Sequence, residues 1–413
     1  MVAPKNIISN ICSKSKSSCK FMEGFVGMKM KLKEICEINP KTREIDDDTE
    51  VSFVPMPSVT EDGKIDTSDI RSYQDVKKGY TVFQEGDVLF AKITPCMENG
   101  KGAIAYGLMN GKGCGSSEFH VLRPNKDVVT AEWIYYLTAW EWFRNEAEKH
   151  MTGSAGQKRV PKAYLENYVV NVPSLEEQKK QTKVLVQLQQ IIDDRKKELI
   201  CLDELIKARF VELFGDPIFN QMNWDTDAVE NLCAEIYGGG TPSKAHPEYY
   251  EDGDIPWVSS KDMKTDVLYD SQIKINQLGV ENSTAKMVPI NSVIMVIRSG
   301  ILKHTLPVAI NVVPITVNQD LKVFIPNERV LSLFLMYQFK MLEKDILSGV
   351  RAVTADNIEF SSLKERKIIV PPIELQEQFV SFVEQTDKSK VVVQKALDET
   401  QQLFDSLMQK YFG

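Results

Sequence analysis

The feature that most constrains this chain is a stretch of sequence that occurs twice. GSAGQKRVPKAYLENYVVNVPSLEEQ, from Gly153 to Gln178, has a counterpart in SGVRAVTADNIEFSSLKERKIIVPPIELQEQ, from Ser348 to Gln378. A recurrence at a distance of about 200 residues indicates that one folding plan is used twice. The chain of 413 residues is also too long for one ordinary core, so we expect two or more domains.

Other landmarks recur in the same order in both halves. Each half has short Val/Ile-rich strands broken by Gly, Pro and Asn, followed by an apolar helix candidate. The pattern predicts an α/β fold of mixed α+β type, with two tandem pseudo-repeated globular units at residues 28–172 and 216–370. Residues 1–27 are rich in Ser and Lys and lack the apolar centre of a signal peptide, so we expect a disordered N-terminal extension there.

Each globular unit is followed by a segment that predicts one long helix, at residues 173–215 and 371–413. Ser174 stands three residues before Glu177, a capping-box pattern for a helix start, and no Pro or Gly follows until Gly215. Apolar residues then recur with heptad spacing over about 40 residues, more weakly in the second segment. Two such helices at equivalent places favour an antiparallel coiled coil, and the alternative is an amphipathic helix lying on each domain. The expected seam residues are Leu185, Leu188, Ile192, Leu199, Leu202 and Ile206 in the first helix and Phe379, Phe382, Val393, Leu403 and Leu407 in the second.

Catalytic and cofactor motifs are missing from the sequence. GLMNGKGCG, from Gly107 to Gly115, lacks the spacing of a phosphate loop, and no GxGxxG loop or methyltransferase tetrapeptide such as NPPF is present. Glu177-Gln178-Lys179 has the spacing of a nuclease ExK motif but lies in the capping box. The four histidines are isolated from any Ser, Asp or Cys partner pattern, and each is interpreted as a surface or buried hydrogen-bonding residue. We therefore expect no catalytic residue, no metal and no bound cofactor, and interpret the chain as a binding protein.

Cysteine usage and hydropathy indicate where such a protein works. The seven cysteines are scattered singly, without a CxxC pair, which is typical of reduced thiols in a cytoplasmic protein. No apolar run approaches the ~18–20 residues that a membrane span needs.

The candidate binding surface consists of polar, Gly-containing, basic loops. The net charge of −8 argues mildly against DNA binding, but a total averages over faces of opposite sign. Lys and Arg neutralise phosphates, while Ser, Thr, Asn, Gln and Arg can read base edges. Any one of these loops can equally be a solvated turn; as a set they favour nucleic acid. The candidates are Lys92, Thr94, Asn99, Lys101, Ser154, Gln157, Lys158 and Arg159 in the first half, and Thr241, Ser243, Lys244, Ser260, Lys261, Arg298, Ser299 and Lys303 in the second.

Several of these motifs together resemble the specificity subunits of type I restriction–modification systems, over nearly the whole chain from Met28 to Gly413. They are AKITPCMENGKGA, GSAGQKRVPKAYLENYVVNVPSLEEQ, GGGTPSK, IPWVSSKDM and VTADNIEFSSLKERKIIVPP. The resemblance implies that residues 28–172 and 216–370 are target-recognition domains and that the segments at 173–215 and 371–413 are conserved spacer helices. It further implies that each domain reads one half of a bipartite, asymmetric double-stranded DNA target, while the coiled coil sets the spacer.

The same resemblance implies that chemistry belongs to partner subunits. Two methyltransferase (modification) subunits would dock on the chain and methylate adenine with S-adenosylmethionine. Restriction subunits would join them to cleave DNA, using ATP and Mg. The chain itself would bind no cofactor and catalyse no reaction.

One departure from the repeat concerns the opening stretch, which the resemblance makes the connection between a recognition domain and its spacer helix. The second copy has Ala355, Asp356 and Asn357 where the first has the basic cluster that begins at Gln157, which argues against a shared phosphate contact. Arg351 is the candidate substitute. The rival interpretation is a coiled-coil protein-interaction scaffold without DNA reading, which would explain the charge of −8.

Overall fold

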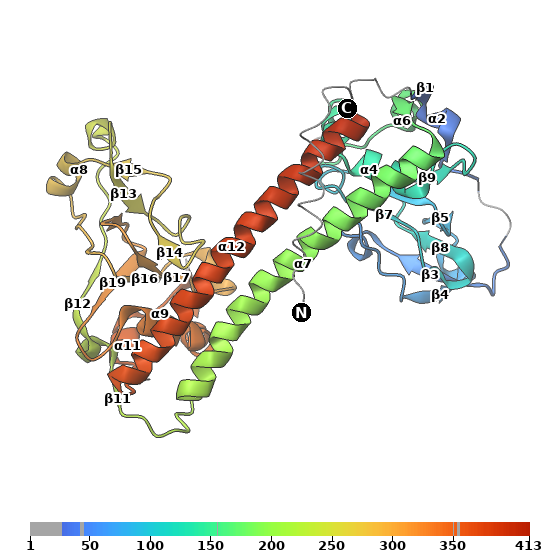
Figure 1. Ribbon diagram of the computed structural model, residues 1–413. Helices are drawn as coiled ribbons and strands as arrows, with labels where there is room; N and C mark the ends of the chain where they lie inside the picture. The colour runs from blue at the N-terminus through green and yellow to red at the C-terminus, as the bar shows by residue number, and fades with distance from the viewer. Residues whose placement is uncertain (1–26, 42–44, 155, 350, 353–355) are drawn as a thin grey trace, which may run out of the picture. The chain divides into compact units, whose positions relative to one another are not determined.

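The computed structural model describes residues 27–41, 45–154, 156–349, 351–352 and 356–413, with only the backbone described for 351, 352 and 356 (Figure 1). The predicted N-terminal extension, apart from Gly27, lies outside these residues. The chain forms two compact units: unit 1 comprises Met1–Asp193 and Leu397–Gly413, and unit 2 comprises Asp194–Ala396. Each unit therefore contains one half of each long helix.

Unit 1 is built on two four-stranded sheets and a two-stranded ribbon. The first sheet has the antiparallel order β2 (Cys36–Ile38), β9 (Phe119–Pro124), β6 (Val88–Ala91), β7 (Gly102–Ile104). The second has the order β4 (Ile70–Ser72), β3 (Glu50–Val54), β8 (Lys112–Gly115), β5 (Thr81–Gln84), and β3 runs parallel to β8. The ribbon pairs β1 (Met28–Lys31) with β10 (Val169–Val172). The helices are α2 (Leu32–Ile35), α3 (Tyr73–Val76), α4 (Ala131–Ala139), α5 (Glu141–Lys149) and α6 (Lys162–Asn167), with 3-10 turns η1 (Met56–Ser58) and η2 (Met109–Gly111).

Unit 2 repeats the core of this topology, with a different number of strands in each sheet. Its first sheet has the order β12 (Cys233–Gly238), β19 (Leu321–Pro326), β16 (Val293–Val296), β17 (Val308–Asn311), β14 (Val267–Leu268). Its second has the order β15 (Lys274–Ile275), β13 (Ile255–Val258), β18 (Thr316–Val317), and β13 runs parallel to β18 as β3 does to β8. Two ribbons pair β11 (Thr226–Ala228) with β22 (Lys367–Ile369) and β20 (Arg351–Ala352) with β21 (Asp356–Asn357). The helices are α8 (Gln277–Glu281), α9 (Ser332–Met341), α10 (Glu343–Ser348) and α11 (Phe360–Glu365), with 3-10 turns η3 (Val229–Leu232), η4 (Pro247–Tyr249) and η5 (Gly300–Lys303). The matching strand orders confirm the predicted tandem repeat of a mixed α+β fold.

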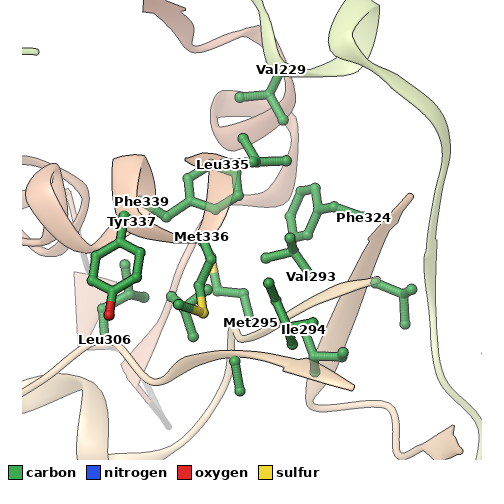
Figure 2. Packing of buried hydrophobic residues seen from close by; sticks show 14 of the residues in the cluster. Val229, Val293, Ile294, Met295, Leu306, Phe324, Leu335, Met336, Tyr337 and Phe339 are labelled. Carbon is green, nitrogen blue, oxygen red and sulfur yellow. The ribbon is translucent and has the colours of Figure 1, made fainter. Parts of the chain in front are cut away.

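The core of each unit forms around one strand that is apolar on both faces. All four residues of β6 (VLFA) and all four of β16 (VIMV) are buried, and each strand lies inside its sheet. In unit 2 the side chains of Val293 and Met295 pack with Phe324 from β19 and with Leu335 and Phe339 from α9 (Figure 2). Continuous apolar runs of this length predict buried strands, and here they do so correctly.

The two long helices are α7 (Leu175–Phe214) and α12 (Ile373–Phe412), each of 40 residues (Figure 1). At the start of α7 the Ser174 hydroxyl accepts a bond from the Glu177 amide at 3.4 Å. At its end Gly215 adopts a left-handed φ of 73°, and its amide bonds to Val211 O at 2.8 Å. A glycine in this conformation terminates a helix without the steric cost that a Cβ would bring.

Within each unit, the halves of α7 and α12 pack together. In unit 1, Leu185 and Met408 are buried in one cluster, with Leu407 partly buried against it. In unit 2, the ring of Phe379 lies 5.4 Å from that of Phe210, and Lys390 Nζ lies 2.6 Å from Asp203. In unit 1 the first half of α7 packs against the end of α12, and in unit 2 the end of α7 packs against the first half of α12. Antiparallel helices require this pairing. Of the other predicted seam residues, Ile192, Ile206 and Val393 are buried, and Leu188, Leu199, Leu202 and Phe382 are half-buried.

Leu403 is a correction to the predicted seam, since its side chain is 43% exposed. After Val393 the buried face continues through Leu397 and Met408, with Phe404 partly buried between them. The face therefore lies one residue later than strict heptads place it. An α-helix has 3.6 residues per turn, so a pattern extended in steps of seven drifts around the helix.

Candidate nucleic-acid interface

Three segments distant in sequence meet at one junction in unit 1. The Lys92 amide bonds to Glu118 O at 2.9 Å, and Lys92 O accepts the Val160 amide, also at 2.9 Å. The Thr94 amide bonds to Lys158 O at 3.1 Å. The structure therefore brings the predicted residues Lys92 and Thr94 beside Lys158, although more than 60 residues separate them in the chain.

The guanidinium of Arg159 is held by Glu118 at this junction. Its Nη2 donates to Glu118 Oε1 at 2.7 Å, its Nε donates to Oε2 at 2.9 Å, and its Nη1 donates to Gln157 O at 3.0 Å. This bond to Arg159 lowers the pKa of the Glu118 carboxyl. Arg159, predicted as a DNA contact, is thus engaged by the protein itself in this structure.

His120 supports the same junction from inside. Its side chain is buried, with Nε2 2.8 Å from Val160 O and Nδ1 2.9 Å from the Asn39 side chain. Burial lowers the pKa of this imidazole, which favours a neutral ring that donates from Nε2. The histidine is a buried hydrogen-bonding residue, one of the two roles expected for it.

The remaining predicted residues of unit 1 differ in their hydrogen bonds and in their exposure to solvent. The Thr94 hydroxyl donates to Glu98 at 2.8 Å, and Lys101 Nζ lies 3.4 Å from Met56 O. Lys92 is half-buried. The exposed members are Asn99, Ser154, Gln157 and Lys158.

Unit 2 builds the same junction with other side chains. The Ile297 amide bonds to Asp320 O at 2.9 Å, and Ile297 O accepts the Ile358 amide at 2.9 Å. Here Arg298 holds the acid, with its Nε 2.7 Å from Asp320 Oδ1 and its Nη2 2.5 Å from the same oxygen. Arg298, like Arg159, is engaged by a carboxylate.

The other predicted residues of unit 2 differ in their bonds and exposure. The Thr241 hydroxyl bonds to the Gln319 side chain, and the adjacent Gly240 amide bonds to Val317 O at 3.0 Å. Ser299 caps η5 by accepting the Ile301 amide, and Ser243 accepts the Ala245 amide at 3.3 Å. Ser260 is half-buried, while Lys244, Lys261 and Lys303 are exposed. Arg351 pairs with Asn357 through its backbone in β20, and its side chain lies outside the described residues.

A buried glutamine in each unit is a structural residue that sequence reasoning missed. Gln178 Nε2 donates to Val128 O and Pro173 O, both at 2.9 Å, and its Oε1 accepts the Thr130 amide at 3.0 Å. Gln178 thus joins the first turn of α7 to the start of α4.

Gln376 makes the same three bonds in unit 2, to Arg329 O at 3.0 Å, to Pro371 O at 2.9 Å and from the Leu331 amide at 2.9 Å. The signal was available in the repeat, because VPSLEEQ and VPPIELQ end on this residue. We call Gln178 and Gln376 the clamp glutamines.

The described residues offer neither a metal site nor a membrane span. Among them, no group of three or more His, Cys, Asp or Glu side chains is arranged to hold a metal ion. No helix in the described part of the chain is long and apolar enough to cross a bilayer.

Comparison with known proteins identifies relatives. The family described as "Type I restriction modification DNA specificity domain" matches residues 26–201 and again residues 223–400. The EcoAI specificity subunit of Escherichia coli is 45% identical over 165 residues, which cover 39% of this chain and 28% of that protein. The EcoR124I/EcoR124II specificity subunit of the same species is 38% identical over 153 residues, or 37% of this chain and 38% of that protein. The matched region thus spans less than half the length of these curated relatives. The MjaIX specificity subunit of Methanocaldococcus jannaschii is 24% identical over 305 residues, 69% of each chain.

Two solved structures share the fold over nearly the whole chain. The type I restriction–modification S subunit from M. genitalium has a TM-score of 0.56 at 13% identity, covering 95% of this chain and 98% of that one. A chain from a study of complex assembly and conformational transition of the type I R-M system also gives 0.56, at 18% identity, covering 93% and 97%. With two matches of the family to the two halves of a duplicated fold, the chain belongs to the type I restriction–modification DNA specificity family.

Proposed function

We propose that the chain is the DNA sequence-recognition subunit of a type I restriction–modification complex, in which each unit reads one half of a bipartite, asymmetric target. The observation that carries the proposal is the backbone junction that occurs once in each unit. Each unit also matches the family of DNA specificity domains. Each junction gathers polar and basic side chains from separate loops. Such a cluster suits a duplex, since lysines bind phosphates and short polar side chains read base edges.

The side chains available for DNA differ from the full predicted set. Lys158, Gln157 and Asn99 in unit 1, and Lys244 and Lys261 in unit 2, are exposed and are the candidates for direct contact. Arg159 and Arg298 are held by acids and are taken up below. The total charge of −8 does not oppose this surface, because many acids lie on other elements such as the first turn of α7.

The long helices are proposed to set the spacer and to dock partner subunits. Both expose apolar side chains that no part of their own unit covers; Val391 and Val392 of α12 are each 69% exposed. Contiguous exposed apolar side chains mark surfaces for protein partners. Two modification subunits that use S-adenosylmethionine, and restriction subunits that use ATP and Mg, would supply the chemistry, while the chain itself would remain non-catalytic and cytoplasmic.

The proposal is tested by DNA binding and by methylation in the presence of a modification subunit. The variant Lys158→Ala/Lys244→Ala, which removes one exposed lysine from each unit, should weaken binding to the cognate duplex and reduce the slope of log K against log salt by about 1–2, one for each lost phosphate contact. Lys126→Ala is the matched control, because this exposed lysine follows the opposite end of β9 from Glu118. An unchanged slope in the double variant, or equal affinity for cognate and scrambled duplexes in the wild type, would favour the scaffold interpretation instead.

The spacer role has its own test. Inserting four residues near Lys196 in α7 adds about 6 Å of helix at ~1.5 Å per residue. Duplex DNA advances about 34 Å in ~10 base pairs, so the methylated motif should keep both halves and lengthen its spacer by about one or two base pairs. A soluble variant that methylates at the original spacing would show that the helices do not set it.

A further inference from the structure

The junctions of the two units can be matched residue by residue through their backbone bonds. Lys92 and Ile297 occupy equivalent positions. The backbone amide of each donates to the carbonyl of an acidic residue, Glu118 or Asp320, and the carbonyl of each accepts the amide of Val160 or Ile358. Glu118 therefore corresponds to Asp320, and Val160 to Ile358. One residue further on, Ile93 corresponds to Arg298, and one residue earlier Arg159 corresponds to Asn357.

The isolated backbone bridges agree with this match. Ile93 bridges to Arg159 in unit 1, and Arg298 bridges to Asn357 in unit 2. In each unit these two facing positions therefore include one arginine, but on opposite sides of the bridge. The acid in the turn faces an arginine in both units.

An acid at this place is unfavourable for a surface that binds a polyanion. Glu118 and Asp320 lie in equivalent turns, after β8 and β18, and their side chains are only about a quarter exposed at 25% and 23%. An unpaired carboxylate there would repel phosphates and would carry a desolvation cost. A paired arginine cancels the charge and ties the turn to a second segment.

We propose that Arg159 and Arg298 are positioning residues that share one role, in which each neutralises the turn acid of its own unit and holds the recognition loops in register. This inference rests on the proposed function. It assigns the two arginines a different role from the exposed lysines, which would contact DNA directly. The position of the acid defines the role. Either of the two residues that face each other in the backbone bridge can therefore carry the arginine.

The geometry supports positioning over direct contact. Arg159 uses Nε, Nη1 and Nη2 within its own unit, and two of these nitrogens bond the carboxylate. A guanidinium forked onto a carboxylate cannot present the same fork to a phosphate. In unit 2 Asp320 is held from the other side as well, by the Asn318 side chain at 3.2 Å.

The test moves the arginine across the bridge. Arg159→Asn removes it from unit 1, and Ile93→Arg/Arg159→Asn places it where unit 2 has it. Arg298→Ile and Arg298→Ile/Asn357→Arg are the reciprocal pair in unit 2, and Asn357 is exposed and can accept the larger side chain. Arg71→Asn is the matched control, because it breaks an arginine–carboxylate pair with Asp69 elsewhere in unit 1.

The first measurement is amide hydrogen exchange in the purified full chain. The Thr94 and Val160 amides should exchange about tenfold faster in Arg159→Asn and return to the wild-type rate in the relocated variant. The Ile358 amide should respond in the same way to the unit 2 pair. Unchanged exchange in Arg159→Asn would overturn the inference, and no change is expected in the Arg71→Asn control.

The second measurement is the methylated motif obtained with a modification subunit. Arg159→Asn should relax one half of the motif only, and the relocated variant should restore that half. If exchange recovers but the half-site stays relaxed, Arg159 itself contacts DNA and the positioning role is wrong. If the wild type gives no methylated motif, the proposed function fails, and the exchange measurement still decides whether the arginines hold the junction.

Discussion

The start of the long helix and the recognition junction each occur once in both units. The hydrogen bonds of the two units agree more closely at the helix start than at the junction. At the helix start, Gln178 and Gln376 make the same three bonds to the same kinds of backbone group. At the junction the backbone bonds match, but the arginine that holds the acid comes from a different segment in each unit. The bonds that direct the helix are thus kept in detail, whereas the junction keeps only its backbone and its charge balance.

At a third position, three residues after each clamp glutamine, the two units carry side chains of different chemistry. Unit 2 has Phe379 there, packed against Phe210, Phe214 and Tyr337. Unit 1 has Gln181, which is 2% exposed and whose Oε1 has no hydrogen-bond partner among the described residues. The same helix turn therefore stabilises one unit by aromatic packing and carries a buried amide in the other.

The largest expected effect comes from removing the aromatic side chain of Phe379. Phe379→Ala should lower the free energy of unfolding by about 3–5 kcal/mol, because it leaves a cavity among the four rings that surround Phe379. Denaturant unfolding of the full chain measures the loss, with the half-buried Phe382→Ala as the control that should lose less. A loss below that of the control would show that the cluster can collapse to fill the space.

The clamp glutamines should give intermediate and equal effects. Gln178→Leu and Gln376→Leu each leave one backbone amide and two carbonyls without their partner, so each should cost about 2–4 kcal/mol. The same unfolding experiment applies, with Gln187→Leu on the exposed face of α7 as the control. Clearly unequal losses would contradict the view that the two helix starts are energetically the same.

Gln181→Leu should have a smaller effect of opposite sign. The leucine removes a buried carbonyl oxygen without a partner among the described residues and adds apolar contact, so stability should rise by about 1 kcal/mol. A rise in the midpoint of urea unfolding would confirm it. A fall would indicate that the amide makes a bond through water or a partner subunit.

The smallest effect is the pH dependence of the Arg159–Glu118 pair. The pair lowers the pKa of Glu118, so its stabilisation is present above the carboxyl's unfolded pKa of about 4.3 and is lost as pH falls through the lower folded value. Arg159→Asn should therefore be less stable than the wild type at pH 7 and approach it at pH 3. A difference that stays constant over this range would mean that the arginine acts through packing alone.

The sequence by itself determined the repeat, the fold class and the two long helices. These features depend on local pattern: apolar runs form β6 and β16, and Gly215 ends α7 where a left-handed residue is needed. Even there, strict heptads misplaced Leu403, because the helix's own 3.6-residue period decides which residues face inward.

Only the tertiary structure decided which of the predicted binding residues meet and what holds them. Arg159 pairs with an acid 41 residues earlier and Arg298 with one 22 residues later, and neither spacing follows from a local period. The buried clamp glutamines were equally hidden, since two of the three bonds of each reach partners 45 to 50 residues away across the fold. Side chains of one type can bind a ligand or the protein itself, and the long-range contacts that choose between these roles form only when the chain has folded.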